Sequence, residues 1–191
     1  MARSLRIEDV AAPWGASLAR KAAAPALFAA LTALGGLVRV WIPGNPVPLT
    51  LQVVAVLLAG AFLRPRAAFA SMALFLGAGL GGAPVFSGGG WGAAYLLGPT
   101  GGYLLGFLAA APLVSWLLRG RSGPAAMALS MAAGVAVIHV LGVLHLAIYL
   151  GGAFAAAVSD TSVFLPMDLA KIGLAAAIGS GASSLRSRRR G

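Results

Sequence analysis

Long apolar stretches recur along the chain, separated by short breaks rich in Arg, Pro and Gly. Six can be delimited, at 22–42, 47–63, 67–80, 100–118, 124–150 and 166–185, and we treat 47–63 as a short span. A helix needs about 20 predominantly apolar residues to cross a bilayer. The pattern therefore predicts an all-α membrane protein whose six transmembrane helices form one domain at 22–185, with tails at 1–21 and 186–191.

The first apolar stretch also has to be distinguished from a signal peptide. It is longer than the apolar core of about 7–15 residues that such peptides have, and no small-x-small cleavage site follows it. We therefore expect this stretch to be a retained helix.

The composition supports this class and excludes others. Of 191 residues, 60% are hydrophobic and 9% are charged, whereas about a quarter of the residues in a soluble domain are charged. A water-soluble fold is nearly excluded, and six spans leave no room for a second domain. The absence of Cys excludes disulfides and thiol chemistry.

The distribution of charge predicts the topology. The chain has 14 Lys and Arg against 4 Asp and Glu, a net charge of +10. All basic residues except Arg39 and Lys171 fall in the tails or in the links at 64–66 and 119–121, which share one side of a six-span layout. Because cytoplasmic loops collect Lys and Arg, we expect a multi-pass protein of the cell membrane with both termini in the cytoplasm. The charge thus reflects topology and not nucleic-acid binding, and the basic C-terminal tail can lie against anionic lipid.

Two predicted outer loops have unusual compositions. Segment 43–52 contains three prolines and the only Asn and Gln of the chain, so it is a rigid connector or an irregular segment that lines a cavity. Segment 81–103 is rich in glycine and contains Phe86, Trp91, Tyr95 and Tyr103. It is either a lid over a ligand or a flexible connector whose aromatic side chains lie at the membrane interface.

Asp168 and Lys171 stand near the start of the last apolar stretch. Their spacing of three places them on one helix face, and ionisable groups are costly inside a membrane. Asp168 also suits the first turn of a helix, where the helix dipole favours a negative charge. The two residues are therefore either a ligand-facing pair or a structural ion pair.

Three other features leave alternatives open or exclude a class. Ala22, Ala26 and Ala30 form a smooth helix face for internal packing or for docking to a separate membrane protein. Arg39 either extends to the outer headgroups or attracts an anionic solute. His139 and His145 are six positions apart and do not share a helix face. With no acid–base pair and no Ser-His-Asp spacing either, we expect no metal, no cofactor and no enzymatic activity.

Four motifs together resemble the BioY family, the biotin-specific substrate-binding (S) components of energy-coupling-factor (ECF) transporters. They are Pro-Val-Pro-Leu-Thr-Leu-Gln at 46–52, Gly-Ala-Pro-Val-Phe at 82–86, Leu-Gly-Pro-Thr-Gly-Gly-Tyr-Leu-Leu-Gly-Phe at 97–107, and Pro-Met-Asp-Leu-Ala-Lys at 166–171. The resemblance implies a six-helix protein that captures biotin from outside. A transmembrane coupling protein, docked at Ala22, Ala26 and Ala30, and separate ATPase subunits would complete the transporter. An S component for another vitamin and a non-transport membrane scaffold are the alternatives.

The resemblance also implies roles for individual residues. Asp168 would accept from the ureido N–H groups of biotin, and Lys171 would donate to the ureido oxygen or the carboxylate. Aromatic side chains would pack on the bicyclic ring, and polar side chains and backbone amides would supply secondary contacts. Where the family can have an Asn in the second loop, this chain has Ser87. The remaining expected site residues are Thr50, Gln52, Phe86, Ser87, Gly89, Trp91 and Tyr103.

Overall fold

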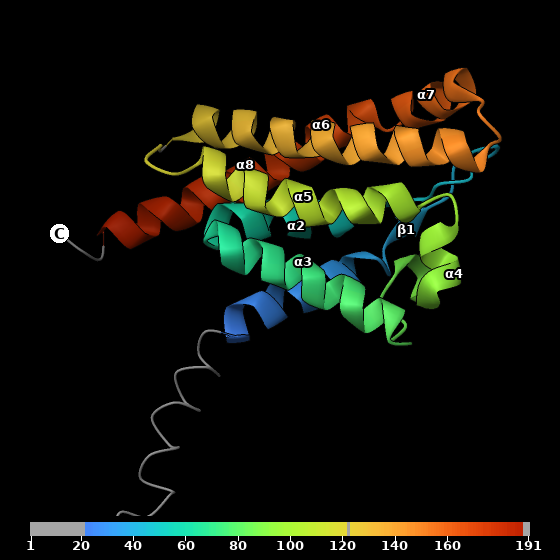
Figure 1. The fold of residues 1–191 in the computed structure, drawn as a ribbon. Helices are drawn as coiled ribbons and strands as arrows, with labels where there is room; N and C mark the ends of the chain where they lie inside the picture. Colours follow the sequence, from blue (N-terminus) through green and yellow to red (C-terminus); the bar gives the residue numbers. More distant parts are fainter. Residues whose placement is uncertain (1–21, 122, 189–191) are drawn as a thin grey trace, which may run out of the picture.

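The computed structural model describes residues 22–121 and 123–188 (Figure 1). The predicted N-terminal tail 1–21 and residues 189–191 of the C-terminal tail lie outside this range. In chain order, the elements are a helix at Ala22–Gly35, strands β1 (Arg39–Val40) and β2 (Leu49–Thr50), helices α2 (Gln52–Phe62) and α3 (Pro65–Leu80), the 3-10 turn η1 (Ser87–Gly89), and helices α4 (Gly92–Leu97), α5 (Gly101–Leu117), α6 (Pro124–Tyr149), α7 (Phe154–Ser162) and α8 (Leu165–Arg188).

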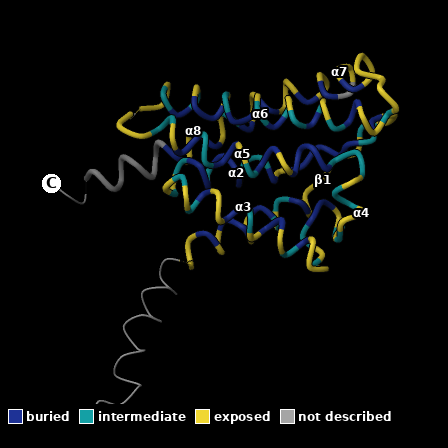
Figure 2. Tube along the Cα trace, in the orientation of Figure 1, coloured by how far each residue is buried: buried dark blue, intermediate teal, exposed yellow. Residues whose placement is uncertain are grey.

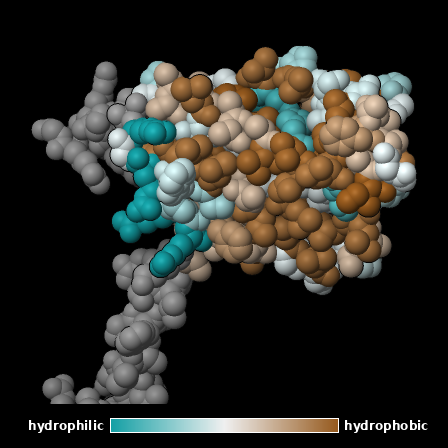
Figure 3. Space-filling view, turned by 45° about the horizontal axis from the view of Figure 1, so that its top comes forward, coloured by the Kyte–Doolittle hydropathy of each residue, from teal (hydrophilic) through white to brown (hydrophobic). Residues whose placement is uncertain are grey.

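The helical class predicted from the sequence is confirmed, and one helix covers most of each of the six apolar stretches. Within the described part of the chain, only α6 has by itself both the length and the apolar composition of a membrane span, with 26 residues and a mean hydropathy of 2.2. Large apolar side chains cover much of the face of the bundle seen in Figure 3. Leu129, Ile148 and Leu169 are among the exposed large apolar residues.

The first helix is shorter than predicted: it ends at Gly35 and not at residue 42. The backbone of residues 51 and 52 crosses the helix there, and a Cβ atom at Gly35 would collide with it. The N–H of Leu51 donates to the Gly35 carbonyl at 3.2 Å. Beyond this point the chain forms an antiparallel hairpin in which Arg39 pairs with Thr50 and Val40 with Leu49.

Two segments expected to be loops contain helices. Residues 92–97 form α4 and residues 154–162 form α7. Both segments contain alanines, which have the highest intrinsic helix propensity. The apolar stretches predicted only the other helices, because these two short helices bury few of their side chains (Figure 2).

The bundle is organised around α5, which packs against α6, α2 and α3, while α8 packs against α6 and α2. Buried residues face the inside of this arrangement (Figure 2). Phe75 and Phe107 belong to one core cluster, and Leu57 and Met131 belong to a second. The α2–α3 and α5–α6 links lie at one end of the bundle, and the hairpin, α4 and α7 lie at the other (Figure 1). The two ends therefore differ in both structure and chemistry.

Candidate functional site

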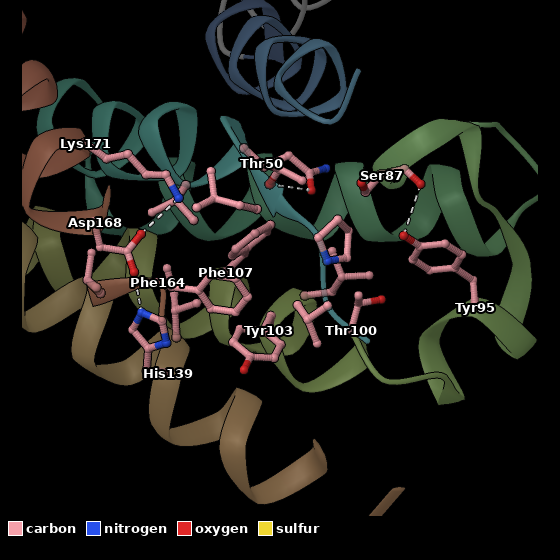
Figure 4. A pocket seen from close by; sticks show the side chains of 18 residues that line it. Thr50, Ser87, Tyr95, Thr100, Tyr103, Phe107, His139, Phe164, Asp168 and Lys171 are labelled. Atoms are coloured by element: carbon pink, nitrogen blue, oxygen red, sulfur yellow. Dashed lines mark hydrogen bonds and ion pairs between the residues drawn. The ribbon is translucent and has the colours of Figure 1, made fainter. Parts of the chain in front are cut away.

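A cavity lies where α2, α5 and α8 begin, against the middle of α6 (Figure 4). Its volume is about 60 Å³. It is lined by Val47, Pro48, Leu49, Thr50, Gln52, Val53, Ser87, Tyr95, Thr100, Tyr103, Leu104, Phe107, Val135, Ile138, His139, Phe164, Asp168 and Lys171. The proline-rich segment 43–52, for which the sequence left a connector or a cavity wall open, forms part of this wall.

The charged centre of the cavity is Asp168, in the first turns of α8. Its Oδ1 accepts from the Lys171 Nζ at 3.0 Å, and its Oδ2 accepts from the His139 Nε2 at 2.5 Å (Figure 4). Asp168 and Lys171 are only 4% and 7% exposed. The two residues therefore form an ion pair and also line the cavity.

His139 joins the site from α6, and the spacing analysis did not find it. Its ring stacks on Phe164 at 6.4 Å between centroids and meets the Tyr103 ring edge to face. Its second ring nitrogen, Nδ1, is buried and has no hydrogen-bond partner in the described part of the chain. One signal could have found this residue: an ionisable side chain inside an apolar helix indicates a functional site whether or not a second ligand shares its face.

Polar groups on the opposite wall come from the hairpin and the start of α2. The Thr50 hydroxyl donates to the Gln52 Oε1 at 3.4 Å, and both side chains are buried. The Gln52 amide nitrogen has no hydrogen-bond partner among the described residues. A buried donor without a partner is costly, so this wall retains unused hydrogen-bonding capacity.

The glycine-rich segment closes the cavity next to the hairpin. The N–H of Gly88 donates to the Gly36 carbonyl, and the Arg39 guanidinium occupies the space that a Cβ at Gly88 would need. The Tyr95 hydroxyl donates to the Ser87 carbonyl at 3.1 Å (Figure 4). The Ser87 hydroxyl is buried without a partner in the described chain. This segment is therefore held to its neighbours by few bonds and presents one free hydroxyl.

Most of the residues expected from the sequence meet in this cavity, and three do not line it. The lining includes Asp168, Lys171, Thr50, Gln52, Ser87 and Tyr103. Phe86 is instead buried in the core, between Phe75 and Tyr95. Gly89 is the last residue of the 3-10 turn η1 within the glycine-rich segment, and Trp91 is 61% exposed.

The alanine face of the first helix is exposed. Ala22, Ala26 and Ala30 are turned outward, whereas Ala29 and Thr32 on the opposite side are buried in the bundle. The small residues of this face therefore do not serve internal packing within the described chain.

The arrangement of the cavity can recognise a small molecule with polar and apolar parts. A carboxylate, an ammonium group and hydroxyls lie on its walls, and Tyr103, Phe107 and Phe164 supply flat apolar surface. Such a combination is typical of a site that fixes orientation by a few polar groups and gains affinity from apolar contact.

A family model and several known proteins are similar to this chain. A sequence model of the BioY family matches residues 5–188. A probable biotin transporter BioY from Pyrococcus horikoshii is 41% identical over 133 residues, which cover 70% of this chain and 78% of that protein. Another, from Lysinibacillus sphaericus, is 47% identical over 93 residues, and the match spans about half of that protein, 46%.

A solved structure shows the same fold. It is the crystal structure of the S-component for biotin from an ECF-type ABC transporter, with a TM-score of 0.81 and 27% sequence identity, covering 92% of this chain and 94% of that chain. The match to the family model extends over the whole described bundle and both walls of the cavity. This chain therefore belongs to the BioY family.

Proposed function

We propose that this chain captures biotin as the substrate-specific component of an ECF-type transporter in the cell membrane. The observation that carries the proposal is the buried Asp168–Lys171 pair on the wall of a cavity with aromatic sides. Biotin has a ureido group with two N–H donors and one carbonyl oxygen, an apolar thioether ring and a carboxylate tail. The Asp168 carboxylate matches the N–H donors, and the Lys171 ammonium matches the ureido oxygen or the tail.

The other lining residues complete the match. Tyr103, Phe107 and Phe164 would pack against the bicyclic ring, and Thr50 and the free Ser87 hydroxyl would contact its polar edge. His139 acts on the substrate indirectly, because its bond fixes the orientation of the carboxylate that accepts from the ureido group.

Binding requires the cavity to enlarge. Its volume of about 60 Å³ is well below the roughly 300 Å³ at the lower end of small-molecule sites. The glycine-rich segment with Ser87 is the part that would move, since the Gly88 N–H bond to the Gly36 carbonyl and the Arg39 contact hold it to the hairpin side, and the Tyr95 bond to Ser87 lies within the segment itself. In this proposal the small cavity represents a closed form, and biotin enters when this segment lifts.

We further propose that six helices cross the membrane, with the cavity toward the outside. The 11 residues of α2 span only about 17 Å of a hydrocarbon core of about 30 Å. The irregular segment before α2 supplies the remaining depth, which is tolerated because it lines a cavity and does not face lipid. The arginine-containing links lie at the other end, which is therefore cytoplasmic.

This topology can be tested directly because the chain has no Cys. Single substitutions Arg121→Cys and Ala153→Cys place an exposed thiol at opposite ends of the bundle. In intact cells, a membrane-impermeant maleimide should label the variant at 153 and not the variant at 121. The reverse pattern would contradict the orientation.

The energy for uptake would come from separate subunits, a coupling protein and two ATPases. The exposed face of Ala22, Ala26 and Ala30 suits close approach of a helix from the coupling protein. A second candidate function, capture of a different vitamin, uses the same cavity and differs only in the ligand.

Binding measurements separate these candidates. Calorimetric titration of the purified full chain with biotin should show saturable binding that excess thiamine or riboflavin does not displace. Displacement by either vitamin would favour the second candidate. The absence of biotin binding by folded protein would defeat the proposal.

A further inference from the structure

A second hollow lies at the end of the bundle opposite the cavity, between the α2–α3 link and the end of α5. We call it the inner groove; its volume is about 930 Å³. Its lining includes Phe62, Arg64 and Arg66 on one side and Trp116 and Arg119 on the other. Neither the resemblance to the family nor the proposed function uses it.

The walls of the inner groove are held together. The Ser115 hydroxyl, near the end of α5, donates to the Leu63 carbonyl, after the end of α2, at 2.5 Å. At Gly60, an added Cβ would collide with the side chain of Val114 and the carbonyl of Ala111. The two helices therefore approach closely at the floor, and the groove has a fixed shape.

Within the described residues, no carboxylate compensates the charge of the inner groove. Of the two carboxylates in the described range, Asp168 is paired with His139 and Lys171, and Asp160 belongs to α7 at the other end of the bundle. No described carboxylate forms an ion pair with Arg64, Arg66 or Arg119. The first turn of α3 has no side-chain cap, so its amides add positive potential at the same place. Figure 3 shows hydrophilic surface gathered at this end, beside the apolar face of the bundle.

The inner groove also exposes large apolar side chains. Phe62 is 41% exposed and Trp116 is 61% exposed. A free phosphate ion would neutralise the arginines and leave both aromatic side chains uncovered. A phospholipid would do both, because its phosphate would neutralise the arginines and its acyl chains, which run along the bundle, would cover the aromatic side chains.

We propose that the inner groove binds an anionic phospholipid, with the phosphate between Arg64, Arg66 and Arg119 and an acyl chain along Phe62 and Trp116. The inference rests on the proposed function in one respect, namely that the chain lies in a membrane with this end at the cytoplasmic surface. Basic pockets between transmembrane helices on that side recognise anionic headgroups. A lipid bound there bridges the α2–α3 and α5–α6 links.

Trp116 provides a local reporter for the test. Replacing the other tryptophans, Trp14, Trp41 and Trp91, by Phe leaves one fluorophore on the wall of the inner groove. This full-length variant would be reconstituted into nanodiscs of phosphatidylcholine containing a small fraction of phosphatidylglycerol with brominated acyl chains, which quench Trp by contact. Brominated phosphatidylcholine at the same fraction gives the reference.

We expect stronger quenching by the anionic lipid. An arginine near an anionic headgroup contributes about 1 kcal/mol, or about a fivefold preference. Removing all three charges by Arg64→Gln, Arg66→Gln and Arg119→Gln should abolish the preference, whereas replacing the same residues by Lys should retain it. A matched control removes three charges from the basic tail, by Arg188→Gln, Arg189→Gln and Arg190→Gln, and should leave the preference unchanged.

Several outcomes would overturn the proposal. Equal quenching by the two lipids, or an equal loss of preference in the tail control, would show general surface attraction and no site. Suppression of the preference by inorganic phosphate, beyond that by chloride at the same ionic strength, would indicate a site for free phosphate. Thermal unfolding, measured on every variant, reports folding, and biotin binding keeps the two proposals separate. If the protein with all three arginines shows no lipid preference but binds biotin, the result counts only against the lipid proposal. If it shows the lipid preference but does not bind biotin, the result counts only against the proposed function.

Discussion

Replacing Asp168 by Asn tests the centre of the proposed site with the smallest change in shape. The carboxylate accepts one bond from Lys171 at 3.0 Å and one from His139 at 2.5 Å. An amide of the same size has only one oxygen, so one of these bonds is lost, and its NH2 group faces a donor. The substitution therefore removes the negative charge and leaves the backbone and the cavity volume nearly unchanged.

The expected changes in the free energy of unfolding and in biotin affinity follow from the burial of Lys171 and from the hydrogen bonds that Asp168 accepts. Lys171 is 7% exposed, and a buried charge that loses its partner lowers the free energy of unfolding by about 3–5 kcal/mol. A charge-assisted hydrogen bond contributes about 1.5–3 kcal/mol. If the ureido group of biotin donates to the Asp168 carboxylate, Asp168→Asn should raise the dissociation constant for biotin about 10- to 150-fold.

A second variant separates a structural role from a binding role. Neutralising both partners, by Asp168→Asn with Lys171→Gln, removes the unpaired charge, so most of the lost thermal stability should return. Biotin affinity should stay low, because neither polar contact is restored. Asp160→Asn on α7 serves as the matched carboxylate control and should bind biotin normally.

The assay combines calorimetric titration of biotin with thermal unfolding of the purified protein. The reasoning is refuted if the single or the double variant is folded and binds biotin with unchanged affinity. Recovery of both stability and binding in the double variant would show that the pair is structural only.

Three further predictions concern the covering segment and the alanine face. Tyr95→Phe removes the hydroxyl bond to Ser87 that stabilises the fold of the covering segment. At about 0.5–1.5 kcal/mol for that bond, stopped-flow fluorescence should show biotin dissociating about 2- to 12-fold faster. An unchanged rate would show that the bond does not retain biotin. Gly88→Ala places a methyl group where φ is 71° and where the Arg39 guanidinium lies. Thermal unfolding should show a larger loss of stability than for Gly82→Ala, where φ is also positive, at 98°, but the surroundings are open. Equal losses would show that the contact between Gly88 and Arg39 contributes nothing. Ala26→Trp, on the exposed face of the first helix, should lower uptake of labelled biotin by cells without changing biotin affinity in the purified protein, and normal uptake would argue against docking there.

Local spacing predicted the part of the site that one helix carries. Asp168 and Lys171 are three residues apart, so the helix itself brings them together. His139 is 29 positions from Asp168 and reaches it only because α6 packs against α8. The spacing of residues along one helix contains no information about how that helix packs against another. The spacing argument therefore excluded a metal site at His139 and His145 and did not find that His139 contacts Asp168.

The glycine-rich segment shows a second limit. Its composition left a lid over a ligand or a flexible connector open, and in the structure Ser87 and Tyr95 line the cavity. Composition did not predict which way each side chain turns. Positive φ angles at Gly88 and Gly89 reverse the chain within one turn, so Phe86 enters the core while Trp91 points to the outside.

The cavity itself follows from the unequal lengths of the helices. Prolines at 43, 46 and 48 prevent helix formation before α2, so α2 begins only at Gln52, and the hairpin occupies the depth that further turns would fill. The starts of α5 and α8 lie around the same space. Neither α2 nor α5 has a side-chain cap at its first turn, so amide donors and the positive ends of these helices remain near the cavity. Such a setting favours a carboxylate at 168 and the oxygen atoms of a bound ligand, and it arises from where the helices start as much as from the side chains that line the space.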